Sequence, residues 1–173
     1  MGQGLIIGEP LGGDSARVQA LAAMLQRAGF DTTASADVRR DIWYKLWGNM
    51  TMNPLTAITG ATVDRVLDDP LTRRFCTAAM AEAAAVGARI GCAIEQTPED
   101  RHQITRKLGA FKTSMLQDVE AGRAIELDAL VTVVQEIAQR VGVATPTIDM
   151  LLGLARLHGR VHGLYPEAAA VSA

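Results

Sequence analysis

Aromatic residues, long apolar runs and an excess of charge of one sign are all scarce in this chain. Its 173 residues include two Trp, two Tyr and three Phe, although 49% of the chain is hydrophobic. A core built from Ala, Leu, Val and Met favours closely packed helices over a β-sandwich. The net charge of −2, with basic residues scattered along the chain, removes the electrostatic basis for binding nucleic acid or anionic lipid.

Cysteine is also scarce, and its spacing excludes the usual metal and redox motifs. Cys76 and Cys92 are the only two, and they form neither a C-x-x-C pair nor a metal-ligand pattern. Free thiols of this kind are typical of the reducing cytoplasm, where we expect the protein to reside. We recognise no signal peptide, and the Ala-rich stretch 78–90 carries Glu82 and Arg89. It therefore predicts a core helix, and we expect no membrane partner.

The first 36 residues predict a strand, a helix and a second strand. An apolar run at 4–8 lies between glycines, Asp14 or Ser15 can cap a helix that ends at Gly29, and residues 30–34 suit a second strand. Two strands and one helix cannot bury both faces of a parallel pair, so we interpret residues 1–36 as a piece of a larger α/β sheet.

From residue 41 onward the signals are helical. Helix starts are predicted at Asp69-Pro70, at Thr97-Pro98 with Asp100 completing a capping box, at Ser114, and at Thr145-Pro146. A further helix spans about 128–141 and ends at Gly142. We therefore predict a helical domain over residues 37–166, followed by a loose tail at 167–173.

Two patterns that suggest ligands are better explained without them. In the loop 8–13, Glu9 and Pro10 stand where a dinucleotide-binding loop needs backbone N–H groups, which argues against phosphate binding. His158 and His162 are spaced i, i+4 but have no third ligand nearby, so we expect a solvated pair and no metal.

The most informative stretch is Lys45-Leu46-Trp47-Gly48-Asn49-Met50-Thr51-Met52-Asn53-Pro54. Lys45, Asn49 and Asn53 recur at i, i+4 and i+8, which places one ammonium and two carboxamides along one helix face among apolar neighbours. Such a stripe suits the mouth of a pocket for an anionic, carbonyl-bearing ligand. It is equally the pattern of a solvated helix face, and Asn-Pro is a common helix-ending signal.

A second stretch joins Ser114 to Glu126. A hydroxyl at a helix N-terminus is a natural place to hold a carboxylate, although Ser114 could simply cap its helix. Glu126 stands within an apolar run, where it could serve a ligand or only complement the dipole of the following helix.

Together, these segments share their order and spacing with a known enzyme family. The segments are Trp43-x-Lys45-Leu46-x-x-Asn49-x-x-x-Asn53-Pro54-Leu55-Thr56-Ala57-Ile58, Glu82 in an Ala-rich helix ending at Gly91, Ser114-Met115-Leu116-Gln117-Asp118, Glu126-Leu127-Asp128, and Gly142-Val143-x-x-Pro146. This pattern resembles ketopantoate reductase (2-dehydropantoate 2-reductase) from about residue 4 to residue 157.

The resemblance implies a fold that is mostly α, like the C-terminal domain of 6-phosphogluconate-dehydrogenase-like reductases, preceded by a strand–helix–strand remnant of a Rossmann domain. Members of the family begin with an NADP-binding Rossmann domain carrying a Gly-rich fingerprint and a further active-site Asn. Neither is present here. We therefore expect the substrate-side half of a reductase, with NADP(H) in the intact enzyme and none bound to this chain.

The resemblance also implies roles for individual residues. Lys45 would be the general acid, buried beside Trp43 and Trp47, and Asn49 and Asn53 would hydrogen-bond the hydroxyl end of a small 2-keto acid. Ser114 would hold its carboxylate and Glu126 its hydroxyl, with Gln117 and Asp118 as supports. Lys45 and Glu126 are the only candidates for contact with the cofactor.

Three alternatives stay open at this point. The chain could be a non-catalytic dimerisation module or remnant, or the reductase could act on another keto acid. We also expect a homodimer joined through residues 4–36, because Leu5-Ile6-Ile7 would otherwise leave strand edges and an apolar face uncovered. The alternative is a collapsed N-terminus on a monomeric helical domain.

Overall fold

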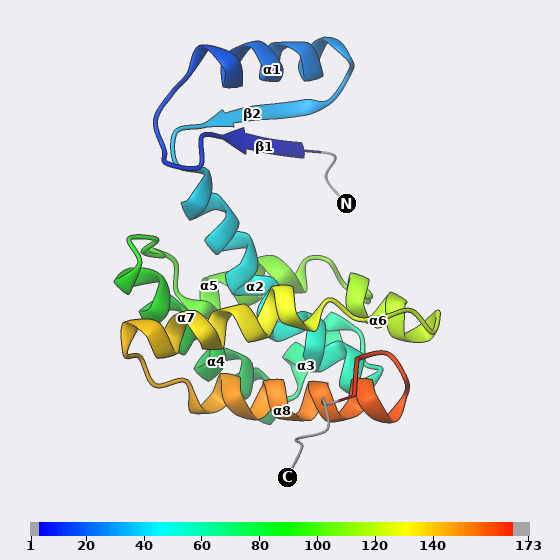
Figure 1. Cartoon of the computed structure of the whole chain (residues 1–173). Helices are drawn as coiled ribbons and strands as arrows, with labels where there is room; N and C mark the ends of the chain where they lie inside the picture. Colours follow the sequence, from blue (N-terminus) through cyan, green and yellow to red (C-terminus); the bar gives the residue numbers. More distant parts are fainter. Residues whose placement is uncertain (1–3, 168–173) are drawn as a thin grey trace. The chain divides into compact units, whose positions relative to one another are not determined.

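A computed structural model describes residues 4–167 and is mostly helical, as predicted (Figure 1). Apart from Glu167, the expected tail at 167–173 lies outside the described residues. No helix within residues 4–167 combines the length and apolar character needed to cross a bilayer. The strands are β1 (Gly4–Gly8) and β2 (Asp31–Ser35), and the helices are α1 (Ala16–Arg27), α2 (Val38–Thr59), α3 (Val63–Asp68), α4 (Pro70–Arg89), α5 (Pro98–Arg106), α6 (Ser114–Glu120), a π-helical turn η1 (Asp128–Thr132), α7 (Val133–Val141) and α8 (Pro146–Val161).

The chain divides into two compact units, residues 1–45 and 46–173, and the division falls inside α2. In the first unit, β1 and β2 form a parallel pair in which Gly4 is opposite Asp31 and Gly8 is opposite Ser35. The predicted strand–helix–strand is therefore confirmed. Of the two candidate caps for α1, Ser15 is the one used, because its Oγ accepts a hydrogen bond from the Val18 N–H at 3.2 Å.

The loop after β1 carries a negatively charged side chain, the carboxylate of Glu9. The Glu9 carboxylate accepts hydrogen bonds from the Ser15 hydroxyl and from Arg17, whose Nε lies 2.7 Å away. The Arg17 guanidinium, with the Ser15 hydroxyl, lowers the pKa of Glu9 to about 2. A phosphate brought to this end of α1 would meet an ionised carboxylate, which argues against dinucleotide binding here.

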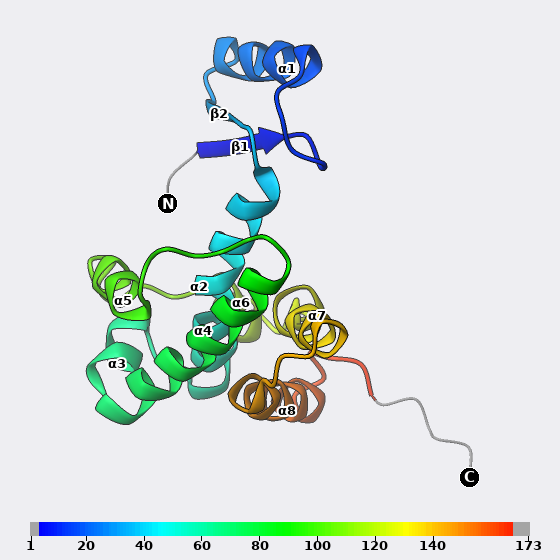
Figure 2. The same ribbon diagram turned by 90° about the vertical axis from the view of Figure 1, so that its left-hand side faces the viewer.

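In the second unit, α4 is the central helix. It packs against α3 and α5 on one side and against α7 and α8 on the other (Figure 2). Trp47 ties α2 to it by donating its indole N–H to the Met80 carbonyl at 2.7 Å. An apolar cluster of α2, α3 and α4 residues fills the space beside them, comprising Met52, Val63, Val66, Leu67 and Cys76.

Most of the predicted helix starts are confirmed. The Asp69 carboxylate accepts from the Leu71 and Thr72 N–H groups, and Thr97 with Asp100 forms the expected capping box. The start of α6 differs by one residue, because Thr113 is the cap and Ser114 is the first helical residue. Thr113 is buried and Ser114 is exposed. The inward residue of the pair is therefore the one that closes the helix end.

Helix α2 begins at Val38 rather than near 41 and continues through Asn53-Pro54 to Thr59. The Asn-Pro pair therefore does not end this helix. Pro54 has no N–H to donate, so one hydrogen bond within the helix is lost. The Thr56 hydroxyl donates to the Asn53 carbonyl at 3.0 Å, which adds a side-chain hydrogen bond close to the proline.

Glu82 of α4 caps α8 from a distant part of the chain. Its carboxylate accepts the Thr147 N–H at 2.9 and 3.1 Å and the Ile148 N–H at 3.0 Å. These are orphan donors in the first turn of α8, whose own cap residue, Thr145, makes no side-chain capping bond. A negative charge there also complements the helix dipole.

We expect Glu82→Ala to lower the free energy of unfolding by about 2 kcal/mol, because the change leaves two half-buried donors without their charged acceptor. Urea unfolding followed by circular dichroism measures the change. Glu136→Ala, at an exposed position of α7, is the matched control and should change stability by less than about 0.5 kcal/mol. Equal unfolding midpoints for the two variants would contradict this role of Glu82.

Candidate functional site

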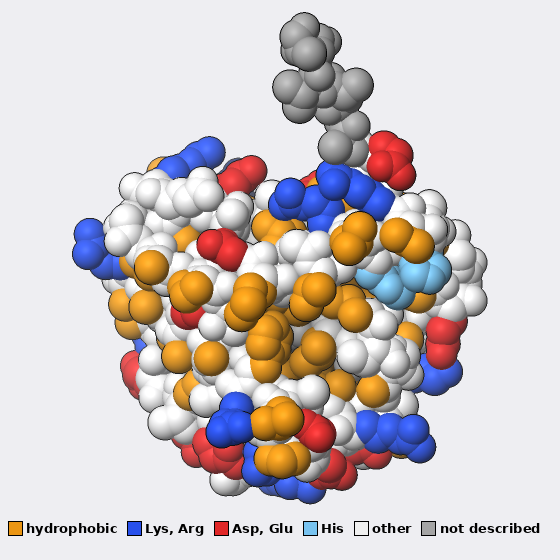
Figure 3. Space-filling model, turned by 90° about the horizontal axis from the view of Figure 1, so that it is seen from below, with side chains coloured by type: hydrophobic (Ala, Val, Ile, Leu, Met, Phe, Trp, Pro, Cys, Tyr) orange, Lys and Arg blue, Asp and Glu red, His pale blue; other side chains and the backbone are white. Residues whose placement is uncertain are grey.

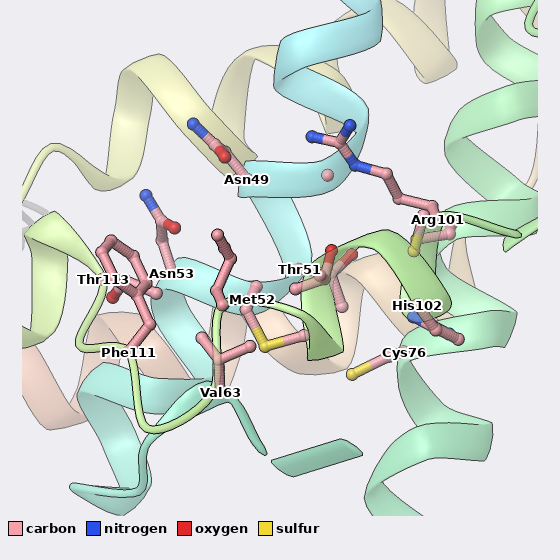
Figure 4. A pocket seen from close by; sticks show the side chains of 14 residues that line it. Asn49, Thr51, Met52, Asn53, Val63, Cys76, Arg101, His102, Phe111 and Thr113 are labelled. Atoms are coloured by element: carbon pink, nitrogen blue, oxygen red, sulfur yellow. The ribbon is translucent and has the colours of Figure 1, made fainter. Parts of the chain in front are cut away.

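The second unit contains a cavity of about 90 Å³ lined by both predicted asparagines. Asn49 and Asn53 come from α2, Arg101 and His102 from α5, and Thr113 from the start of α6. Figure 4 shows the two carboxamides extending from the same face of α2, as their spacing predicted. Within the described residues neither carboxamide has a hydrogen-bond partner, although Asn53 is buried. Both amides are therefore available to a ligand.

A chain of hydrogen bonds through two threonine hydroxyl groups links α6 to α2 beside the cavity. The Leu116 N–H donates to Thr113 Oγ1 at 3.2 Å, and Thr113 Oγ1 lies 2.7 Å from Thr56 Oγ1. Thr56 uses its single proton on the Asn53 carbonyl, so Thr113 must be the donor between the two hydroxyls. This chain runs from the first turn of α6 to the backbone of Asn53, and it fixes α6 against α2.

His102 is a buried pocket residue, although the sequence offered no signal for it. Its side chain is 2% exposed, and Nε2 lies 3.1 Å from the Thr77 hydroxyl. Because that hydroxyl donates to the Arg73 carbonyl, Nε2 is assigned the ring proton. Desolvation, with a smaller contribution from Arg73, lowers the pKa of His102 against the opposing effect of Glu99. The ring is therefore neutral near pH 7.

Arg101 contributes the charge of the cavity. It is the only Lys, Arg, Asp or Glu among the described lining residues. Burial raises the pKa of the Cys76 thiol to about 12, so that group is neutral as well. With a neutral His102, the guanidinium of Arg101, which has an interaction partner of its own in the fold, is the one charged group among the described lining residues.

Lys45 differs from its predicted environment. It is exposed, whereas Trp43 and Trp47 are buried, so the expected burial of Lys45 beside the two tryptophans is wrong. Residues two apart on a helix point to different sides, which separates the ammonium from both indoles. Lys45 lines a cavity of about 310 Å³ within the first unit, formed with residues of β1 and the start of α2.

Ser114, Gln117 and Asp118 lie on or beside the first turn of α6, and none of them is among the described lining residues of the 90 Å³ cavity. Gln117 Nε2 donates to the Lys112 carbonyl at 3.0 Å, and Asp118 accepts from Arg123 Nε at 2.9 Å. These bonds hold the segments before and after α6. Gln117 therefore links α6 to the segment before Ser114, and Asp118 links α6 to the segment that follows it.

Glu126 is exposed between two buried residues, Ile125 and Leu127. Directly after them, η1 opens with Asp128, which accepts from Tyr165 Oη at 2.6 Å and from Thr132 Oγ1 at 2.8 Å. The Tyr165 hydroxyl, followed by that of Thr132, lowers the pKa of Asp128. π-Helical turns occur often at functional sites, and this one begins two residues after Glu126.

Comparison with known proteins assigns the chain to a family. The family model for the C-terminal part of ketopantoate reductase PanE/ApbA matches residues 37–159. The chain belongs to the ketopantoate reductase family. A 2-dehydropantoate 2-reductase from Mesorhizobium japonicum is 41% identical over 164 residues, which are 95% of this chain and 50% of that protein. One from Halobacterium salinarum is 29% identical over 89% of this chain and 51% of its own length.

Solved structures agree with this family assignment. A candidate ketopantoate reductase from Ralstonia solanacearum MolK2 has a TM-score of 0.91 and 59% identity, over 95% of this chain and 50% of the other. The 2-dehydropantoate 2-reductase from Methylococcus capsulatus has a TM-score of 0.85 and 31% identity, over 91% and 51%. The present chain spans about half the length of these ketopantoate reductase relatives.

Three polar residues that line the pocket of this ketopantoate reductase family member were not predicted from the sequence. They are Arg101, His102 and Thr113. Arg101 and His102 stand in a charged helix start that resembles an exposed surface. Thr113 is one residue before the motif serine. The detectable signal was the Thr at 113, because Thr is also a preferred helix cap and stands directly before Ser114.

Proposed function

We propose that this chain is the substrate-binding half of an NADPH-dependent 2-keto acid reductase, and that its substrate is 2-dehydropantoate (ketopantoate), reduced to pantoate for coenzyme A biosynthesis. The observation that carries the proposal is the pair of unpartnered carboxamides of Asn49 and Asn53 in a pocket with one positive charge. Donors and a cation are what a ligand with a carboxylate, a carbonyl and a hydroxyl requires.

Reduction of a ketone develops negative charge on its oxygen, so the site needs a proton or a positive charge at that atom. Lys45 is the proposed general acid. It lies one helical turn before Asn49 on α2. Asn49 and Asn53 orient the substrate, Glu126 binds its hydroxyl, and Ser114 adds a hydrogen bond beside the α6 N-terminus. Gln117 and Asp118 position Ser114 through the bonds described above.

The described residues do not fit the pyrophosphate of NADPH. Within residues 4–167 there is no Gly-rich loop of the dinucleotide-binding type, and the loop between β1 and the N-terminus of α1 holds the Glu9 carboxylate. We therefore assign no dinucleotide phosphate contact to this chain, and only Lys45 and Glu126 stand as candidates for contact with the nicotinamide end. Hydride donation has to come from a cofactor held by another polypeptide segment.

Another 2-keto acid is the second candidate substrate. A solved D-mandelate dehydrogenase, bound to NADH and anilino(oxo)acetate according to its description, shares the fold at 21% identity with a TM-score of 0.83. The carboxamide pair suits the 2-oxo acid group common to such ligands, while the acyl end distinguishes them. A non-catalytic dimerisation module is the remaining alternative.

The free, buried thiols of Cys76 and Cys92 fit a reducing cytoplasm.

The test joins this chain, at residue 1, to the preceding half of the Mesorhizobium japonicum relative. We expect the fusion to oxidise NADPH in the presence of ketopantoate, and to prefer ketopantoate over benzoylformate. Absorbance of NADPH follows the reaction. A fusion that binds NADPH but reduces neither acid would contradict a reductase, and a preference for benzoylformate would contradict ketopantoate as the substrate.

A further inference from the structure

The stretch that carries Glu126 has no regular structure of its own. Residues 123–126 belong to neither a helix nor a strand, and Glu126 is exposed between the buried side chains of Ile125 and Leu127. A backbone outside helices and strands takes its position from hydrogen bonds and packing with other segments. The contacts on either side of Glu126 therefore decide where its carboxylate lies.

The chain that follows α8 supplies such contacts. Gly163 ends the helix with φ at 67°, in the left-handed region, and two hydrogen bonds of a Schellman motif close the turn. The Leu164 N–H donates to the Gly159 carbonyl at 2.7 Å, and the Gly163 N–H donates to the Arg160 carbonyl at 3.0 Å. Figure 1 shows the chain turning back at this point. We call residues 163–166 the C-terminal turn.

The C-terminal turn binds the backbone directly before Glu126. The Ile125 N–H donates to the Leu164 carbonyl at 3.0 Å, and both side chains are buried. Ile125 lies outside any helix or strand, so no ladder of its own satisfies this N–H. The bond to Leu164 therefore gives Ile125 the fixed backbone position that a regular element would otherwise provide.

A second bond fixes the residue two positions after Glu126. Tyr165 Oη donates to Asp128 Oδ1 at 2.6 Å. The hydrogen bond to Asp128 raises the pKa of Tyr165, so the phenol keeps its proton, and the same bond lowers the pKa of Asp128, so the carboxylate is ionised at neutral pH. Hydrogen bonds with one ionised partner are the stronger class. Glu126 thus stands between two anchored positions, one on each side.

A glycine near the end of α8 makes room for this arrangement. A Cβ added to Gly159 would lie 2.7 Å from Tyr165 Cβ and 3.1 Å from Ile125 Cδ1. Three segments therefore meet at one buried glycine: α8, the C-terminal turn and the stretch before Glu126. Glycine inside a helix is unfavourable relative to alanine, and this close approach is the packing reason for its use at 159.

Arg160 of α8 also fastens the C-terminal turn. Its Nε donates to the Pro166 carbonyl at 3.1 Å, and its Cζ lies 5.8 Å from the centroid of the Tyr165 ring, within the range of a cation–π contact. Figure 3 shows basic side chains close to the histidines of α8, on the side of the molecule where the described chain ends. Backbone, charge and ring contacts together hold Tyr165 in place.

We propose that Tyr165 and the Leu164 carbonyl are positioning groups, which hold residues 125–128 so that the Glu126 carboxylate meets the hydroxyl of the substrate. The inference rests on the proposed function, in which Glu126 binds that hydroxyl. Neither Tyr165 nor Leu164 is among the described lining residues of the 90 Å³ cavity, so their effect on the substrate passes through Glu126.

The physical basis of the proposal is preorganisation. A carboxylate accepts hydrogen bonds and a substrate hydroxyl donates one, so Glu126 is chemically suited to the hydroxyl. A glutamate on a mobile loop would have to order both its backbone and its side chain when the substrate binds. With the backbone already held on both sides, only the side chain remains to be ordered. The C-terminal turn therefore sets the preference for a hydroxylated 2-keto acid.

The test compares two acids in the fused reductase. Ketopantoate carries the hydroxyl, and trimethylpyruvate is the same 2-keto acid with a hydrogen atom in its place. We expect Tyr165→Phe to lower kcat/KM for ketopantoate about 10-fold and to leave kcat/KM for trimethylpyruvate within about twofold. The loss should lie mainly in KM, because the hydroxyl is not a reacting group.

A double-mutant cycle shows whether Tyr165 acts through Glu126. Glu126→Ala alone should lower the preference for ketopantoate over trimethylpyruvate about 100-fold, and adding Tyr165→Phe should lower it no further. Thr132→Val is the matched control. It removes another hydrogen bond to Asp128, of 2.8 Å, but one that lies within η1, so the preference should stay unchanged.

Hydrogen exchange on the 173-residue chain gives a readout that does not depend on catalysis. The Ile125 amide should exchange at least about 10-fold faster in Tyr165→Phe than in the wild-type chain, because the segment opens locally more often. Amides of α4 should keep their rates, which shows that the variant is folded. Gly159→Ala should act in the same direction, since its methyl group displaces Tyr165 and Ile125 together.

Four results would overturn the inference. They are an active fusion whose preference ignores Tyr165→Phe, equal losses for the two acids, a further loss of preference when Tyr165→Phe is added to Glu126→Ala, and an unchanged exchange rate of the Ile125 amide. The proposed function fails differently, because the wild-type fusion would then bind NADPH and reduce neither acid.

Discussion

Replacing Lys45 by alanine in the fused reductase is expected to lower kcat by about two to four orders of magnitude, the usual contribution of a positioned acid. The alkoxide formed on reduction would lose its proton donor, while the proposed hydrogen bonds from Asn49 and Asn53 to the acid would remain. The KM for ketopantoate should therefore change little. Steady-state kinetics of NADPH oxidation separates the two parameters.

Lys112→Ala is the matched control for this prediction. Lys112 is an exposed lysine of the same unit as the pocket, paired with Glu120 at 2.6 Å, and its loss should leave kcat within about twofold. Lys45→Arg keeps a positive charge but cannot give up a proton at neutral pH, and it should be nearly as slow as the alanine variant. A loss below tenfold in Lys45→Ala would remove Lys45 from the chemistry.

The second large effect is an all-or-none difference between the isolated chain and the fusion. The 173-residue chain alone should show no NADPH-dependent reduction of ketopantoate, and calorimetry should find NADPH binding no tighter than roughly millimolar. The reason is that dinucleotide affinity depends on a Gly-rich loop and a helix N-terminus open to phosphate. Here the corresponding loop contains Glu9, ionised beside Arg17.

Fusion to the relative's N-terminal half should restore both NADPH binding and turnover. The control is a second fusion, in which a Gly-Ser linker of equal length replaces the Gly-rich dinucleotide-binding loop expected in that half. This control should be inactive. Measurable reduction by the purified 173-residue chain would falsify the view that the cofactor is held elsewhere.

Local signals in the sequence were sufficient for most of the fold. Asp69-Pro70 and Thr97-Pro98 start helices where predicted, because a cap residue and an N1 proline act on the next few N–H groups and need no distant partner. The spacing of Asn49 and Asn53 predicted a shared face for the same reason. Helical geometry relates positions four apart, whatever surrounds the helix.

The tertiary structure decided which side of each helix is buried and which distant groups meet. No local rule relates Glu82 to the first turn of α8, Thr56 to Thr113, or Arg101 to Gly48, since each pair is separated by more than fifty residues. For the same reason the predicted burial of Lys45 was wrong, and no local signal marked His102 as buried.

The sequence by itself determined the helical content, most of the helix starts, the parallel strand pair and the family pattern, because these depend on periodicity and on contacts between near neighbours. Only the tertiary structure placed one guanidinium, two carboxamides and a neutral imidazole around a single cavity. Burial, desolvation and charge at a site arise from packing between segments, and they take their values only once those segments are in contact.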